Sequence, residues 1–208
     1  MEYVLYGAGG HAKVVLDIIH SQGNRVIGVL DDHLQQTKWN NINVLGTKDC
    51  IPGVIKEFPQ ALFMVTIGNN QTRNKIVSNL KENGCRFGAA IHSSAIIGSN
   101  VRIGIGTVIM PNVVINAGTF IGDHVIINTA ATVDHDCSLS DYVHICPGVH
   151  MAGGVQIGWG TQIGTGASLI PQIRVGSNTI VGAASCVIRD VPDHVVAVGN
   201  PSRVIRDE

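Results

Sequence analysis

Apolar residues recur at every sixth position through the second half of the chain. From Ile91 to Val187 each sixth residue is a branched aliphatic or Met, and the residue four places after each of these is small or β-branched. Neither the 3.6-residue period of a helix nor the two-residue period of a strand produces this spacing, which is typical of hexapeptide-repeat solenoids. We therefore expect parallel strands wound into triangular coils of three hexapeptides, with the large aliphatic side chains stacked inside a prism.

The position directly after the large aliphatic residue is often glycine. Seven residues show this: Gly98, Gly104, Gly122, Gly158, Gly164, Gly176 and Gly182. Because glycine adopts positive φ readily, the sequence predicts that the corners of the prism bend at these positions.

The first part of the chain alternates between strand and helix patterns. An apolar run at 2–6 leads into a glycine turn, apolar residues then follow at helical spacing up to Gly23, and a second strand at 25–30 ends in Asp31 and Asp32. This β-α-β pattern places the glycine turn and the helix N-terminus at the carboxyl edge of a parallel sheet, where backbone N–H groups can bind an anion.

Further elements complete this region. We expect a polar loop at 35–43, a short helix at 47–58 interrupted near Pro52, and a strand at 61–67. A helix at 71–83 should have Arg73 on its water-facing side and end at Gly84. The predicted organisation is a Rossmann-like α/β domain at 1–86, an all-β helix of hexapeptides at 87–192, and a C-terminal tail at 193–208.

Composition narrows the classes of function. The net charge of −1 gives no electrostatic basis for binding nucleic acid or an anionic membrane. The N-terminus lacks a basic segment followed by an apolar run, and no stretch is long enough to cross a membrane, so we expect a cytoplasmic protein without membrane insertion. The five cysteines form no CxxC pair and are expected to be reduced.

The glycine turn reads G-x-G-x-x-A from Gly7 to Ala12, and Asp31 lies where a ribose-binding acid is expected. The span before the repeat is short for a complete dinucleotide fold, which favours a mononucleotide site. A turn needed only for packing the helix on the strand is the alternative. The predicted nucleotide site, with an acidic rim for hydroxyl groups, consists of Gly9, Gly10, His11, Asp31, Asp32 and Gly68.

One hexapeptide carries side chains suited to proton transfer. In the hexapeptide 133–138, His135 stands between Asp134 and Asp136. A neutral histidine beside a carboxylate can act as a general base, because the carboxylate orients the ring and stabilises the imidazolium. The alternative is an ordinary solvated surface histidine. His144 lies one and a half faces further on, so the two rings would meet only across a subunit boundary.

The histidines also raise the question of a metal site. His92, His124, His144 and His150 stand at intervals that do not form a ligand set, although ligands from different coils or subunits could converge. We expect no metal.

The combination of motifs resembles a known family. The motifs are 6–11 (YGAGGH), 29–32 (VLDD), 67–70 (IGNN) with Arg73, the hexapeptides, 134–137 (DHDC) and 198–201 (VGNP). Across essentially the whole chain they resemble the bacterial sugar acyltransferases that include sialic acid O-acetyltransferases and N-acetyltransferases of UDP-4-amino-sugars. The resemblance implies a left-handed β-helix, an exception to the usual right-handed crossover, assembled as a homotrimer with acetyl-CoA between adjacent prisms.

The resemblance also implies roles for individual residues. His135 corresponds to the general base and Asp136 to the acid that supports it, while His144, Thr165 and Ala183 correspond to positions that contact acetyl-CoA. Thr165 and Ala183 are also one coil apart and so would stack along one edge.

The expected reaction is direct transfer of an acetyl group to the amine of a UDP-linked amino sugar for surface glycan synthesis. O-acetylation of sialic acid or another sugar, a silent nucleotide-binding trimeric scaffold, and an NAD-dependent enzyme are the alternatives.

Overall fold

A computed structural model describes residues 1–208, which divide into two compact units, Met1–Ser93 and Ser94–Glu208. The finer division at 86/87 and 192/193 stays a prediction. No helix in either unit has the length and apolar character needed to cross a membrane.

The first unit is built on a mainly parallel sheet with the strand order β3-β4-β2-β1-β5-β6. Its central strands are β1 (Glu2–Tyr6), β2 (Arg25–Leu30) and β5 (Leu62–Val65), and β6 (Arg86–Phe87) completes one side. After β1 the chain adds β2, β3 and β4 on one side of β1, and it then crosses to add β5 and β6 on the other side. The switch point therefore lies at the carboxyl ends of β1 and β5, where open α/β sheets bind ligands.

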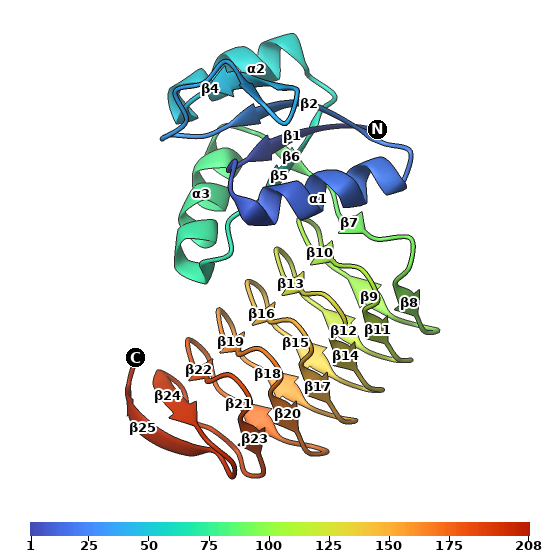
Figure 1. Ribbon diagram of the computed structural model, residues 1–208, viewed down its shortest axis with the longest axis vertical. Helices are drawn as coiled ribbons and strands as arrows, with labels where there is room; N and C mark the ends of the chain where they lie inside the picture. Colours follow the sequence, from blue (N-terminus) through green and yellow to red (C-terminus); the bar gives the residue numbers. More distant parts are fainter. The chain divides into compact units, whose positions relative to one another are not determined.

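Two longer helices follow the strands that border this switch point (Figure 1). Helix α1 (Gly10–Ser21) follows β1 and buries Ala12, Val15, Leu16, Ile18 and Ile19, which confirms the helical spacing. Helix α3 (Asn70–Glu82) follows β5 and begins with Asn69, whose side chain accepts a hydrogen bond from the Thr72 N–H at 2.9 Å. The β-α-β unit predicted from the sequence is confirmed.

The loop predicted at 35–43 is wrong. Strands β3 (Lys38–Trp39) and β4 (Ile42–Gly46) form an antiparallel hairpin. Asn40 and Asn41 turn it, with φ of 44° and 62°, and asparagine tolerates this left-handed region well. The polar composition concealed the hairpin because Trp39 is its one buried side chain.

The predicted interruption at Pro52 is also wrong. A 3₁₀ turn, η1 (Lys48–Cys50), leads into helix α2 (Ile51–Glu57), and Pro52 stands in the first turn of that helix. Proline is well suited to this place because the first N–H groups of a helix have no intrahelical partner. Pro52 therefore starts the helix.

The second unit is a left-handed parallel β-helix with three faces (Figure 1). It follows β7 (Ala90–Ile91). Face I comprises β10 (Val108–Ile109), β13 (Ile126–Ile127), β16 (His144–Ile145), β19 (Gln162–Ile163) and β22 (Ile180–Val181). Face II comprises β8 (Ile96–Ile97), β11 (Val114–Ile115), β14 (Thr132–Val133), β17 (His150–Met151), β20 (Ser168–Leu169) and β23 (Cys186–Val187). Face III comprises β9 (Arg102–Ile103), β12 (Phe120–Ile121), β15 (Ser138–Leu139), β18 (Gln156–Ile157) and β21 (Arg174–Val175).

The six-residue period corresponds to the inner side chains of these faces. The second residue of each short strand is the periodic aliphatic, and the registers Ile115↔Val133 and Val133↔Met151 stack it one coil above its equivalent. From Ile109 to Val187 all these residues are buried, with at most 3 % exposure. The predicted aliphatic core is confirmed.

The predicted role of the corner glycines is wrong. Positive φ falls on the third residue after each aliphatic from Ile97 to Val181, for example Asn100, Gly118 and Asp136, and not on the first. The glycines at the first position are required by stacking: a Cβ on Gly98 would lie 2.7 Å from the Ala117 nitrogen, and one on Gly164 would lie 2.5 Å from the Ala183 nitrogen. The backbone of the next coil passes too close for a side chain.

The residues after the repeat close one face of the prism. Strand β24 (Val195–Val198) continues face I in parallel beside β22, and β25 (Arg203–Asp207) pairs antiparallel with β24. The last coil therefore does not leave the edge of β22 unpaired on this face.

Candidate functional site

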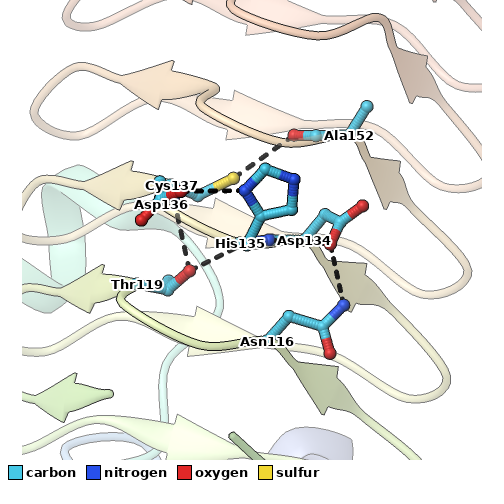
Figure 2. A network of polar contacts seen from close by, with 7 residues as sticks. All are labelled: Asn116, Thr119, Asp134, His135, Asp136, Cys137 and Ala152. Carbon is cyan, nitrogen blue, oxygen red and sulfur yellow. Dashed lines mark hydrogen bonds and ion pairs between the residues drawn. The ribbon is translucent and has the colours of Figure 1, made fainter. Parts of the chain in front are cut away.

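The corner 134–137, between β14 and β15, is held by the coils below and above it (Figure 2). The Thr119 hydroxyl donates to the Asp134 carbonyl at 2.9 Å and accepts the Cys137 N–H at 3.3 Å. From the coil above, the Gly154 N–H donates to the His135 carbonyl at 2.9 Å. The backbone around His135 is therefore fixed by the prism itself.

The His135 ring projects from this corner and is oriented by Asp136. The side chains of His135 and Asp136 are 62 % and 73 % exposed, and His135 Nδ1 lies 2.8 Å from Asp136 Oδ2. With the Nδ1 proton directed at this carboxylate, Nε2 of the neutral ring is left as the acceptor. Asp136 has φ of 57°, a conformation that aspartate tolerates better than most residues.

Two negative charges favour protonation of this ring. The hydrogen bond to Asp136, followed by the charge of Asp134, raises the pKa of His135 above its usual value. A base with a raised pKa binds the transferred proton more strongly, which suits the sequence-predicted role of His135.

Gly153 lies directly against the His135 ring. A Cβ on Gly153 would be 2.6 Å from both Cε1 and Nε2 of the imidazole. Gly153 is not among the glycines with positive φ, so its backbone conformation does not require glycine. The missing side chain instead leaves room for the ring one coil below.

His144 lies on face I, away from this corner. The Asn128 side-chain amide lies 3.3 Å from His144 Nε2, and Asn128 Oδ1 accepts the Thr129 N–H at 2.9 Å. The sequence reasoning did not identify Asn128. A usable signal was present, because it is a polar residue at the first corner position, where glycine is frequent.

Thr165 and Ala183 are stacked and exposed at the corner between faces I and II. The Ala184 N–H donates to the Thr165 carbonyl at 2.8 Å, which sets the two corners one above the other. His135 lies at the corner between faces II and III. One chain therefore does not bring His135 together with Thr165 and Ala183 at a single corner.

The glycine turn of the first unit presents open backbone. Gly9 and Gly10 are exposed, and no atom lies within 4 Å of the place where either Cβ would be. Gly9 is the N-cap of α1 and provides no side-chain hydrogen bond to the helix. The first N–H groups of α1 are thus accessible at the positive end of the helix dipole, which is a suitable arrangement for an anion.

Asp31 and Asp32 organise the loops around this turn. Asp31 accepts the N–H groups of Ala8 at 2.8 Å, His33 at 2.9 Å and Leu34 at 3.1 Å. Asp32 accepts the Tyr6 hydroxyl at 2.8 Å and the Lys48 N–H at 2.9 Å. Both carboxylates therefore stabilise the surrounding loops. Only the lone pairs that these hydrogen bonds leave unused could accept a hydrogen bond from a ligand.

These hydrogen bonds affect the acid–base behaviour of the pair. Burial works to raise the pKa of Asp32, but the hydrogen bonds from Lys48 and Tyr6 outweigh it, so that the pKa is lowered. Burial and the bond to Asp32 raise the pKa of Tyr6. Asp32 therefore stays a carboxylate and Tyr6 a neutral phenol.

Arg73 is buried beneath the Gly68 loop, so its predicted place on the water-facing side of α3 is wrong. The side chain is 1 % exposed and donates to the carbonyls of Ile67 and Gly68, at 3.1 and 3.0 Å, and to Asn70 Oδ1 at 2.9 Å. A guanidinium can fix a loop in this way because its donors form a planar fork. Arg73 thus shapes the backbone next to Gly68.

His11 lies in the first turn of α1 with its Nε2 buried and without a hydrogen-bond partner. Burial, followed by the positive charge of Arg73, lowers the pKa of His11 to about 4. The ring is therefore neutral at physiological pH.

Nowhere in the chain are three His, Cys, Asp or Glu side chains grouped so that they could hold a metal ion.

Two family models match the chain, one within each of the two units. Residues 2–80 match the PglD N-terminal domain, and residues 94–129 match the bacterial transferase hexapeptide with six repeats. The hexapeptide match covers the first coils of the prism.

Solved structures resemble the chain over nearly its full length. A mutant of perosamine N-acetyltransferase from Caulobacter crescentus, in complex with CoA and GDP-perosamine, superposes with a TM-score of 0.96 at 37 % identity, covering 100 % of this chain and 98 % of that one. The acetyltransferase domain of PglB from Neisseria gonorrhoeae FA1090, in complex with acetyl coenzyme A, gives a TM-score of 0.91 at 37 % identity, covering 98 % of each chain.

A sequence relative points to the same class. UDP-N-acetylbacillosamine N-acetyltransferase from Bacillus subtilis (strain 168) is 40 % identical over 107 residues, which are 51 % of this chain and 50 % of the relative. The match therefore spans half the length of that protein.

Proposed function

The chain belongs to the bacterial hexapeptide-repeat sugar acyltransferases that carry a PglD-type N-terminal domain, and on that premise we propose that it acetylates the amino group of a nucleotide-linked amino sugar with acetyl-CoA. The observation that supports this most strongly is the exposed His135–Asp136 pair, whose ring has Nδ1 occupied and Nε2 open. This is the arrangement that a general base requires.

His135 is the proposed base in a direct transfer. The sugar amine attacks the thioester carbonyl, a C–N bond forms, and Nε2 takes the proton that the amine loses. The C–S bond then breaks, and the proton passes from the imidazolium to the leaving sulfur, which gives CoA thiol and the N-acetyl sugar. Asp136 stabilises the imidazolium between these two steps, and no acyl-enzyme is needed.

The first unit is the proposed site for the nucleotide. The open N–H groups at Gly9 and Gly10 suit the diphosphate, and Asp31 and Asp32 offer lone pairs to N–H or O–H groups of the base or sugar. His11 and Gly68 border the same turn. We propose UDP as the nucleotide, as the sequence motifs suggest, with GDP as the rival that the experiment must separate.

The prism is the proposed site for acetyl-CoA. His144, Thr165 and Ala183 line it in this proposal, and Asn128 holds the His144 ring. Because these residues and His135 lie at different places around one prism, we propose a homotrimer in which neighbouring chains supply the two halves of each site. The reaction would take place in the cytoplasm, where acetyl-CoA and nucleotide sugars are made.

The test is release of CoA thiol with a panel of acceptors. UDP- and GDP-linked amino sugars and sialic acids are offered with acetyl-CoA, and we expect release with a nucleotide-linked amino sugar together with an N-acetyl product by mass spectrometry. Release with sialic acid alone would replace N- with O-acetylation. Nucleotide binding without release from any acceptor would favour a silent scaffold and overturn the proposal.

A further inference from the structure

Asp134 flanks His135 on the side opposite to Asp136, and the mechanism above does not use it (Figure 2). Its Oδ1 accepts the backbone N–H of His135 at 2.8 Å and the side-chain amide of Asn116, one coil below, also at 2.8 Å. With Oδ1 engaged by two donors, this carboxylate is directed at the main chain of His135 and the coil below. Asp134 therefore contacts the backbone of His135, whereas Asp136 contacts its ring.

This pair departs from the rest of the prism. Asn116 and Asp134 both stand at the first corner position, which is glycine at seven other corners because the next coil passes close by. In the stacked series of first-position residues along this edge, 98, 116, 134, 152, 170 and 188, they are the only hydrogen-bonding side chains, and they contact each other. The fold does not require polar residues here, since Ala152 and Ile170 occupy the same position in the coils above.

We infer that Asp134, held in place by Asn116, is a positioning residue that anchors the backbone of the catalytic corner and presents a fixed negative charge to the His135 ring. The inference rests on the proposed function of His135 as base. The anchor acts because the hydrogen bond from the His135 N–H to Asp134 fixes the backbone from which the ring projects. The charge acts because an imidazolium forms during the reaction and a carboxylate one residue away stabilises it.

The surroundings of the ring leave few other charges to account for a pH effect. The corner contributes Asp134, Asp136 and the Cys137 thiol, whose pKa is raised chiefly by burial and whose Sγ donates to the Ala152 carbonyl at 3.3 Å. The coil below contributes Asn116, Ala117 and Thr119, and the coil above contributes Ala152 and Gly153, all uncharged. On β17, His150 is engaged by the Thr132 hydroxyl at 2.9 Å.

The test separates anchor from charge with two substitutions. Asp134→Asn keeps an oxygen for both donors and removes the charge, whereas Asp134→Ala removes both. For Asp134→Asn we expect the acid limb of the kcat/KM profile and the NMR titration midpoint of the His135 ring to move together to lower pH. The plateau rate should fall by less than about tenfold. For Asp134→Ala we expect the same shift with a larger loss, because a displaced base transfers protons poorly.

Asp141→Asn is the matched control. Asp141 is also a prism aspartate that accepts a backbone hydrogen bond, from the Asp123 N–H at 2.8 Å, but it lies at the corner between faces III and I. We expect it to leave the His135 midpoint and the acid limb unchanged. Asn116→Ala should reproduce part of the Asp134→Ala loss, since Asp134 keeps its charge but loses its lower support.

The outcomes distinguish this inference from the proposed function. If Asp134→Asn leaves both the ring midpoint and the acid limb unchanged while His135→Ala is inactive, the positioning role is refuted and the base survives. If His135→Ala keeps normal turnover, the proposed mechanism itself is refuted. A shift of equal size in Asp141→Asn would show that the effect is general to the charge of the prism, and it would also refute the role of Asp134.

Discussion

His11 of the first unit and His135 of the second both lie at candidate sites, and their surroundings are opposite. His11 lies in the first turn of α1 with a buried Nε2, near the cation of Arg73, and its pKa is lowered to about 4. His135 lies on an exposed corner between two carboxylates, and its pKa is raised. The same side chain is therefore kept neutral in one unit and made a stronger base in the other.

The difference indicates a division of labour. A ring that stays neutral across the physiological range can donate or accept a hydrogen bond to a ligand without changing charge. A ring whose pKa is raised by neighbouring carboxylates holds a transferred proton more firmly and can carry it between two substrates. We therefore expect His11 to serve recognition and His135 to serve the chemical step.

Replacing each histidine by alanine tests this contrast most directly. For His135→Ala we expect a loss in kcat of about 10²–10⁴, because general acid–base catalysis contributes this much. For His11→Ala we expect a higher KM for the nucleotide sugar with kcat changed far less, since only binding is weakened. Steady-state kinetics by thiol release gives both values, and light scattering with CoA titration verifies that assembly and cofactor binding persist. Equal losses of kcat in both variants would contradict the division.

Gly153→Ala should displace the His135 ring without changing any charge. Its new methyl group would meet Cε1 and Nε2 of His135 at 2.6 Å, so the ring must move away from its position. Because a misplacement of about 1 Å can cost on the order of a hundredfold, we expect a loss of roughly that size in kcat.

Two glycines serve as controls for that substitution. Gly53→Ala, in α2, has no atom within 4 Å of its new Cβ and should leave the rate unchanged without lowering the melting temperature. Gly98→Ala meets the backbone of the next coil and should lower the melting temperature. A Gly153→Ala enzyme with normal kcat would show that the ring does not depend on this open space.

The pH dependence of stability tests the recognition side. The folded pKa of His11, about 4, lies below the ordinary value of 6.5, so below pH 6.5 the unfolded chain binds the proton first. The stability that the neutral ring contributes is present above pH 6.5 and is lost progressively as the pH falls towards 4. Between pH 7 and 5 this amounts to about 2 kcal/mol.

Thermal unfolding at several pH values measures this effect. We expect His11→Gln to reduce the decline of melting temperature between pH 7 and 5, by a few degrees in a chain of this size. The control is His20→Gln, on the exposed face of the same helix, which should leave the decline unchanged. An unaltered decline in His11→Gln would show that His11 titrates normally in the folded protein.

The sequence predicted the two units unequally well for physical reasons. The prism has a strict period, so the faces, the inner residues from Ile109 to Val187 and the corner holding His135 followed directly. What the period did not reveal was why glycine stands at a given corner. Gly98 and Gly118 stand at different positions of the hexapeptide, but only the coordinates show that the first position serves close stacking and the third serves positive φ.

The first unit was less predictable because its informative contacts are between distant residues. Arg73 read as a surface residue of an amphipathic helix, yet its guanidinium is buried against the carbonyls of Ile67 and Gly68. Asp31 read as a ligand contact, yet it accepts three backbone N–H groups of its own unit. A charged residue type predicts exposure, and tertiary hydrogen bonds override that expectation.

Asp136→Asn sharpens the comparison at the smallest scale, since it changes one charge beside His135 and little else. Asparagine also tolerates the φ of 57° found at this position, so the corner should keep its shape. The amide oxygen can still accept the Nδ1 proton, but it stabilises the imidazolium less well than a carboxylate. We expect a loss of about tenfold in kcat and an acid limb shifted to lower pH.

Asp136→Ala should lower kcat further, because it removes the ring's partner and also places a residue less tolerant of positive φ at the corner. If Asp136→Asn kept full activity with an unmoved acid limb while Asp136→Ala lost activity, Asp136 would matter for the shape of the corner alone. His135 would then owe its basicity to Asp134, and the raised pKa that distinguishes it from His11 would arise from the opposite side of the ring.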